Sequence, residues 1–143
     1  LSKGLGCPIG SVLIGDEALM QHAIRIRKIL GGGMRQVGYL AAAGLYALDN
    51  NIHRLVDDHN KAKEIGEVLN GLTFIKKVEP VETNIIIFEL RQKTDETKFL
   101  RLLEANNIRL SGMGQGKLRI VTHLDYTDAM HDRFLSVLKQ VKI

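Results

Sequence analysis

The sequence lacks tryptophan and is poor in other aromatic residues, with three tyrosines and four phenylalanines among 143 residues. It therefore offers no set of aromatic side chains on which the bases of single-stranded nucleic acid could stack. The single cysteine, Cys7, excludes a framework of internal disulfides and fits a reducing compartment, so we expect a cytoplasmic protein. No apolar run has the length of a bilayer-spanning helix, and we expect no membrane partner.

The amino-acid composition is typical of an ordinary globular protein. Hydrophobic residues make up 45% and charged residues 25% of a chain long enough for one domain with a proper core. The formal net charge of +4 is mild, and its clearest cluster comprises Arg25, Arg27, Lys28 and Arg35. A basic nucleic-acid-binding module is therefore one alternative, and salt-dependent binding to DNA or RNA would identify it.

Because the sequence starts without methionine and in the middle of a motif, we expect a piece of a longer protein.

The first half of the sequence predicts a strand followed by helices. Residues 9–14 are typical of a short buried strand, and Asp16 can cap a helix that ends at the three glycines 31–33. Residues 34–70 have apolar side chains at three- and four-residue steps, which indicates one long helix or two helices with a kink at residues 49–51. The small side chains of residues 41–44 should let another segment pack closely.

The second half predicts a small antiparallel sheet covered by helices. We expect strands at residues 73–78, 84–90, 108–110 and 117–123, a turn at 112–116, and helices capped by Thr94 and Thr127, the second with Met130, Phe134, Leu138 and Val141 on its apolar side. Alternation along residues 117–123 places Leu118, Ile120 and Thr122 on one face of the strand and Arg119, Val121 and His123 on the other.

Several common sites can be set aside. The glycines of residues 4–6 and 31–33 lack the remaining residues of a dinucleotide or phosphate loop. His53, Asp57 and His59 have no second pair of ligands, so a solvated helix surface is favoured over a metal site, and we expect no metal. No serine, histidine and aspartate show the motif of a nucleophilic triad. The cations Lys3, Arg35 and Arg119 remain as candidates.

The segments around these cations are similar to a known family. They are Leu1-Ser2-Lys3-Gly4-Leu5-Gly6-Cys7-Pro8-Ile9-Gly10-Ser11-Val12, Arg27-Lys28-Ile29-Leu30-Gly31-Gly32-Gly33-Met34-Arg35-Gln36 with Leu40-Ala41-Ala42-Ala43-Gly44, Val81-Glu82-Thr83-Asn84, and Leu118-Arg119-Ile120-Val121-Thr122-His123. In this order they resemble the low-specificity L-threonine aldolases, which are pyridoxal-phosphate enzymes of the aspartate-aminotransferase-like type (fold type I). The joint match of the first two segments is much more specific than either alone.

The resemblance implies a fold and a division of the chain. The fold would be α/β, of the aspartate-aminotransferase-like type. Residues 1–33 would end the large cofactor-binding domain, residues 34–70 would form the connecting helix, and residues 71–143 would form the small α+β domain. The whole protein would be a homo-oligomer, a dimer of dimers.

The resemblance also implies roles for four cations. Lys3 would bind pyridoxal 5'-phosphate covalently, Arg35 and Lys28 would face its phosphate, and Arg119 would bind the substrate carboxylate. The activity would be cleavage of L-threonine or L-allo-threonine to glycine and acetaldehyde.

Two enzyme-related alternatives stay open. One is another lyase or an aminotransferase of the same fold, acting on a small amino acid. The other is a catalytically inactive homologue, against which the joint presence of Lys3, Arg35 and Arg119 argues. Family features that precede the cofactor lysine, such as the phosphate-binding loop and the ring-stacking histidine, are absent from these 143 residues. We therefore expect the chain alone not to cleave threonine.

Overall fold

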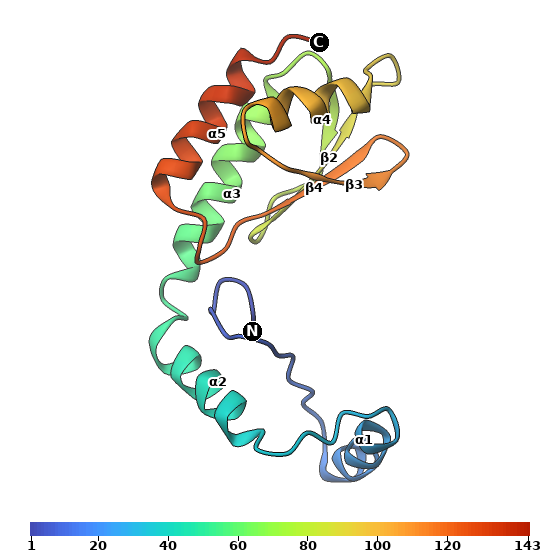
Figure 1. Ribbon diagram of the computed structural model, residues 1–143, viewed down its shortest axis with the longest axis vertical. Coiled ribbons are helices and arrows are strands. Elements are labelled where there is room, and N and C mark those ends of the chain that lie inside the picture. Colours follow the sequence, from blue (N-terminus) through green and yellow to red (C-terminus); the bar gives the residue numbers. More distant parts are fainter. The chain divides into compact units, whose positions relative to one another are not determined.

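The four strands of the protein lie in one sheet. The computed structural model describes residues 1–143 as two units, residues 1–52 and residues 53–143 (Figure 1). In the second unit the strands are β1 (Ile75–Val78), β2 (Ile85–Leu90), β3 (Ser111–Gly114) and β4 (Lys117–Val121), all antiparallel, in the order β1-β2-β4-β3. The predicted antiparallel sheet is confirmed, with β4 paired on both sides.

Three helices cover one face of this sheet, as predicted. They are α3 (Leu55–Asn70), α4 (Glu96–Ala105) and α5 (Asp128–Gln140). Each contributes two or more side chains to the same core as Ile86 and Phe88 of β2 and Leu118 and Ile120 of β4. The other face of the sheet is open, since Ile85 is 42% exposed and Arg119 is exposed.

Phe99 lies at the centre of the core, so its truncation should strongly destabilise the fold. Its ring is fully buried and packs 5.6 Å from that of Phe74 and 6.4 Å from that of Phe88, measured between ring centroids. Replacing Phe99 with alanine should lower the free energy of unfolding by about 3–5 kcal/mol, because a large cavity would form between α4 and the sheet. Urea unfolding measures the change.

The control for Phe99→Ala is Met130→Ala on α5. Met130 is 54% exposed, so its truncation should change the free energy of unfolding by less than about 0.5 kcal/mol. Equal losses in the two variants would contradict this description of the core. Met130 lies on the apolar side of α5, as predicted, because it is one helical turn before Phe134 and lines the same cavity, but it is exposed, whereas Phe134 and Leu138 are buried.

The β3–β4 hairpin differs from the sequence prediction. We predicted a strand at 108–110 and a turn at 112–116, but β3 occupies residues 111–114. The turn takes two residues, Gln115 and Gly116, with φ of 54° and 73°. Positive φ at both central residues is typical of a tight type I′ hairpin turn, which leaves the preceding glycines free to pair with β4.

The helix caps agree with the sequence with one exception. Asp16 and Thr127 cap α1 (Glu17–Ile29) and α5 by accepting hydrogen bonds from Leu19 N and Met130 N. For α4 the predicted cap, Thr94, is wrong, because Asp95 accepts the bond from Lys98 N instead. The Thr94 hydroxyl donates to the carbonyl of Phe74 at 3.4 Å.

The first unit contains α1 and α2 (Gly38–Asn50). Helix α1 ends before the three glycines, as predicted. The predicted strand at 9–14 is wrong: these residues form no strand and are exposed. Their β-branched side chains favour extended backbone, but no other strand lies in this unit with which they could pair.

The periodic segment 34–70 forms two helices. Helix α2 ends at Asn50 and α3 begins at Leu55, so the interruption starts at Asn51, within the segment 49–51 that suggested a kink. The two helices belong to different units. The division of the whole protein at residues 33 and 70 stays a prediction. No helix of the chain has the length and hydrophobicity needed to cross a membrane.

Candidate functional site

Lys3 lies in a tight turn that leaves its side chain exposed. The Gly6 N–H donates to the carbonyl of Lys3 at 2.9 Å, and the Cys7 N–H donates to the carbonyl of Leu1 at 3.1 Å. Gly6 has φ of 72°, a conformation that glycine adopts without steric cost. These two bonds close the turn and present the lysine amine away from the backbone.

The turn that carries Lys3 is held against α2. The Cys7 thiol donates to the carbonyl of Ala43 at 3.6 Å, and the Asn51 side-chain amide donates to the carbonyl of Leu5 at 2.8 Å. A Cβ added to Gly44 would lie 3.6 Å from the Leu1 side chain. The small residues of α2 therefore allow the close approach that the sequence predicted at residues 41–44.

Lys28 and Arg35 lie on either side of the three glycines. Lys28 is in the last turn of α1, and a Cβ added to Gly33 would lie only 2.8 Å from its Cδ atom. Glycine at position 33 therefore lets the chain fold back along the Lys28 side chain. Arg35 is exposed in the segment between α1 and α2. No hydrogen bond or ion pair joins Lys3, Lys28 and Arg35 to one another, although all three belong to the first unit.

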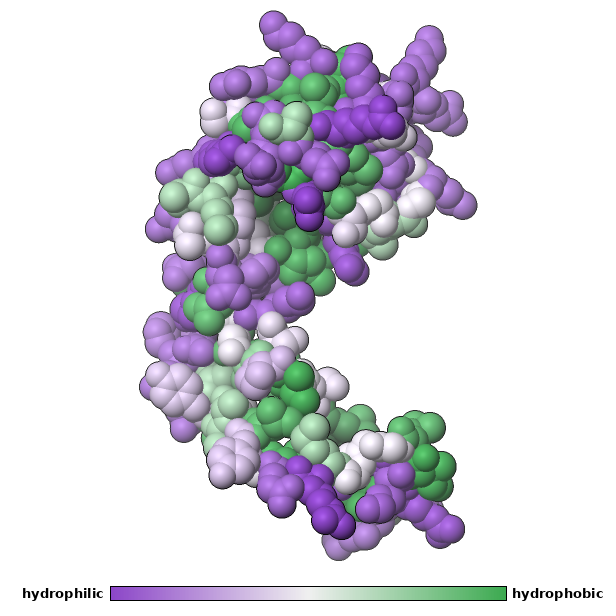
Figure 2. Space-filling view, in the orientation of Figure 1, coloured by the Kyte–Doolittle hydropathy of each residue, from purple (hydrophilic) through white to green (hydrophobic).

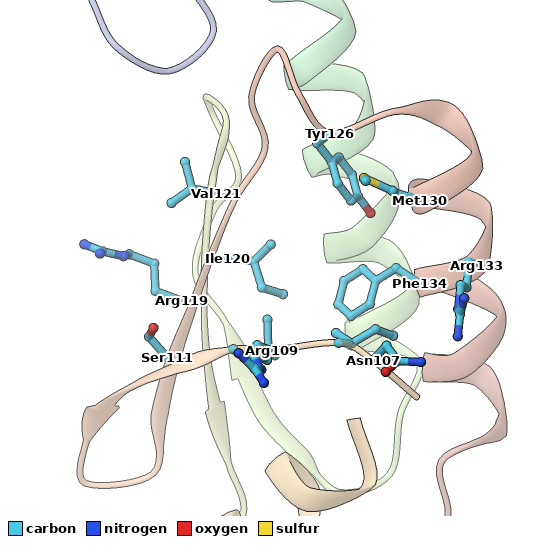
Figure 3. Close-up of a pocket in the computed structure, with 12 residues that line it drawn as sticks. Asn107, Arg109, Ser111, Arg119, Ile120, Val121, Tyr126, Met130, Arg133 and Phe134 are labelled. Atoms are coloured by element: carbon cyan, nitrogen blue, oxygen red, sulfur yellow. The ribbon is translucent and has the colours of Figure 1, made fainter. Parts of the chain in front are cut away.

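Arg119 belongs to the second unit and lies in the middle of β4. It pairs with Ile87 on β2 and with Ser111 on β3. In Figure 3 the side chains of Arg119 and Ser111 lie on one side of β4, whereas Ile120 and Phe134 lie on the other. This confirms the predicted alternation and places the guanidinium over the open face of the sheet.

A cavity of about 510 Å³ adjoins Arg119 at the edge of β4. Two further cations, Arg109 and Arg133, line it together with apolar side chains such as Phe134 and Ile120. Neither arginine was predicted from the sequence, because Arg109 lies in a loop and Arg133 on a helix, and no sequence motif marks them. Arg109 and Arg133 make the lining of this cavity positive, since no carboxylate lines it, whereas the Arg119 guanidinium lies on the other side of β4 (Figure 3).

A second group of polar side chains joins α3 to α5. The buried His131 bonds through Nε2 to Glu64 at 2.9 Å and through Nδ1 to the Tyr126 hydroxyl at 3.3 Å. Burial raises the pKa of Tyr126 far above its usual value. Lys61 contacts Asp128 at 2.7 Å and lowers the pKa of that carboxyl through a hydrogen bond. No spacing in the sequence predicted this group. Nowhere do three or more His, Cys, Asp or Glu side chains lie close enough together to hold a metal ion.

Comparison with known proteins gives close relatives. The chain is 41% identical to low-specificity L-threonine aldolase 1 of Arabidopsis thaliana, over 100% of this chain and 41% of the relative. It is 40% identical to the low specificity L-threonine aldolase of Escherichia coli K12, over 87% of this chain and 36% of the relative. The chain thus spans about two fifths of the length of these curated relatives.

Solved structures share the fold. A putative aromatic amino acid beta-eliminating lyase/threonine aldolase from Exiguobacterium sp. 255-15 matches 96% of this chain and 42% of its own, with a TM-score of 0.66 and 22% identity. A transaminase with L-ala matches 87% of this chain and 34% of its own, with a TM-score of 0.60 and 19% identity. The predicted aspartate-aminotransferase-like α/β fold is confirmed.

The family is settled by a match over most of the chain. Residues 1–93, which include the Lys3 turn, the three glycines and Arg35, match the model of the beta-eliminating lyases. These residues run through both helices of the first unit and into the sheet of the second. The chain belongs to the beta-eliminating lyase family.

Proposed function

We propose that the whole protein carrying this chain uses pyridoxal 5'-phosphate to cleave L-threonine and L-allo-threonine into glycine and acetaldehyde. The observation that carries the proposal is the 41% identity to a low-specificity L-threonine aldolase over the entire chain. The matched region includes the Lys3 turn, the triple-glycine segment and the Arg119 strand. Under this proposal Lys3 is the catalytic residue of the chain, and the substrate is a small amino acid.

The residues of the first unit fit the cofactor chemically. Lys3 offers a primary amine on a flexible stem, exposed in a turn that is fixed to α2. Its amine would attach to the aldehyde carbon of the cofactor. Arg35 and Lys28 would bind the phosphate through charge-assisted hydrogen bonds. When bound, the cofactor withdraws electrons from the bonds at the substrate Cα and so makes them easier to break.

Arg119 would bind and orient the substrate carboxylate. A guanidinium presents two parallel N–H donors to a carboxylate, and its position on a doubly paired strand restricts the range of its head group. Fixing the carboxylate fixes the bond at Cα that is to break. Loss of the substrate hydroxyl proton lets the Cα–Cβ bond break, acetaldehyde leaves, and a proton takes its place at Cα to give glycine.

The proposal includes assembly of the whole protein as a cytoplasmic dimer of dimers. Figure 2 shows apolar and weakly polar residues at the surface of the first unit, where many large hydrophobic side chains are exposed. They include Ile14, Ile29, Leu30 and Tyr39, each more than 70% exposed. Exposed apolar patches of this kind are typical of surfaces that bind another protein. In such an assembly Arg35 would approach a cofactor phosphate across a subunit boundary.

A product assay tests the proposed function. The whole protein, loaded with pyridoxal phosphate, is incubated with threonine, allo-threonine or serine, with and without a keto acid. We expect acetaldehyde and glycine from threonine and allo-threonine without any keto acid, because an aldol cleavage needs no amino-group acceptor. Amino-group transfer that depends on the keto acid, without release of acetaldehyde, would contradict the proposal and identify an aminotransferase.

A further inference from the structure

A buried threonine anchors the strand that carries Arg119. Thr122 is 1% exposed and lies directly after β4, three residues beyond Arg119. Its hydroxyl donates to the carbonyl of Asp58 in α3 at 2.7 Å. Its backbone N–H donates to the carbonyl of Asn84 at 3.0 Å, and its own carbonyl accepts from the Asn84 side-chain amide at 2.7 Å. Thr122 therefore ties the end of β4 to α3 and to the residue that precedes β2.

The helix end of this anchor is itself held by an ion pair. Asp58 lies in the first turn of α3 and is 1% exposed. Its two carboxylate oxygens accept hydrogen bonds from the two terminal nitrogens of Arg54 at 3.1 and 3.2 Å. A bidentate pair of this kind fixes both side chains in one geometry. The Asp58 carbonyl is thus presented to Thr122 from a rigid helix start.

The anchor lies where the sheet stops supporting β4. On one edge the pairing with β3 begins at Ser111 opposite Arg119, so Ile120 and Val121 have no strand on that side. On the other edge β2 continues to pair with β4 as far as Ile85 opposite Val121. The cavity beside β4 opens at the unpaired edge. Arg119 is therefore the last doubly paired residue of its strand, and beyond it β4 is held by β2 and by the bonds of Thr122 to Asn84 and to Asp58 of α3.

We propose that Thr122 and Asn84 are positioning residues for Arg119. Their hydrogen bonds fix the end of β4 and thereby the backbone from which the Arg119 guanidinium reaches a substrate carboxylate, a role that rests on the proposed function. A long exposed side chain keeps its own torsional freedom, so the precision of its head group depends on a fixed backbone. In this role Thr122 and Asn84 act through the backbone of β4 and not through contact with the substrate.

Substitution of the hydroxyl tests this role. Thr122→Val keeps the shape of the side chain and removes the donor to Asp58, whereas Thr122→Ser keeps the donor. In the whole protein we expect Thr122→Val to raise the KM for threonine about tenfold, with a smaller change in kcat, and Thr122→Ser to stay within about twofold of wild type. Thr94→Val is the matched control, because its hydroxyl bonds to Phe74 and makes no contact with β4.

A second measurement needs no activity. Hydrogen exchange in the 143-residue chain should be about tenfold faster at the amides of residues 119–121 in Thr122→Val than in Thr122→Ser or Thr94→Val. Should Thr122→Val fail to fold, Asn84→Asp takes its place, since a carboxylate cannot donate to the Thr122 carbonyl; the same increases in KM and exchange are expected.

Three results would count against the proposals in different ways. Unchanged exchange at residues 119–121 would overturn the anchoring of β4. Faster exchange with an unchanged KM would overturn the positioning of Arg119. A wild-type protein that releases no acetaldehyde would contradict the proposed function, while the exchange comparison would still decide the anchoring.

Discussion

Replacing Lys3 with alanine is expected to lower acetaldehyde release by the whole protein at least about a thousandfold, because the residue that we propose as the covalent attachment site of the cofactor is lost. The structure provides the physical basis. The lysine is exposed in a closed turn, so its truncation removes an amine without removing a core contact. The fold should stay intact, and thermal unfolding of the variant should match that of wild type.

Borohydride reduction supplies the direct measurement for Lys3. After reduction in the presence of pyridoxal phosphate, mass spectrometry should find the added cofactor mass on the wild-type peptide that contains Lys3. The Lys3→Ala protein should carry none. Lys93→Ala is the control, since Lys93 is an exposed lysine of the other unit and should leave both labelling and activity unchanged. Cofactor mass on another lysine of the wild-type protein would show that Lys3 is not the attachment site.

Replacing Arg119 with lysine is expected to lower kcat/KM for threonine about a hundredfold, mainly through KM. The charge is kept, but an ammonium is a point charge and cannot make the two parallel hydrogen bonds that a guanidinium makes with a carboxylate. Steady-state kinetics with threonine and allo-threonine measure the loss. Because Arg119 is exposed on the open face of the sheet, the free energy of unfolding should change little.

Arg109→Lys is the matched control for Arg119→Lys. Arg109 lines the same cavity but lies in the loop before β3, where its side chain is 88% exposed and stands 3.6 Å from Glu104. We expect kcat/KM to change by less than about twofold in this variant, because surface ion pairs of this kind contribute little. A large loss of kcat/KM in Arg109→Lys, with none in Arg119→Lys, would indicate that Arg109 and not Arg119 binds the substrate carboxylate.

The elements that the sequence predicted correctly depend on neighbouring residues. Asp16 and Thr127 cap their helices because a side-chain oxygen reaches an N–H three residues ahead, which is a purely local arrangement. The alternation that separates Arg119 from Leu118 and Ile120 follows from the two-residue period of a strand. The small residues before Leu45 accommodate the Lys3 turn because side-chain volume alone decides how close a backbone can come.

The predictions that were wrong concern segments whose state depends on a distant partner. Residues 9–14 have the composition of a strand but no strand beside them in their unit, so they do not form one. Residues 111–114 have the composition of a turn, yet β4 supplies a pairing edge and the two-residue turn at Gln115 leaves them free to use it. The absence of a hydrogen-bonding partner in the first case, and its presence in the second, overrides local propensity.

The sequence by itself determined the family, the α/β fold, the N-terminal caps of α1 and α5, and the four cations on which the proposed site is built. Only the tertiary structure decided that Thr122 bonds to Asp58, 64 residues away, and that His131 bonds to Glu64, 67 residues away. Such bonds form between groups that chain folding brings together, and no periodicity or spacing records them. The proposed support of Arg119 depends on this kind of contact, because it requires α3, the start of β2 and the end of β4 to meet at the buried Thr122.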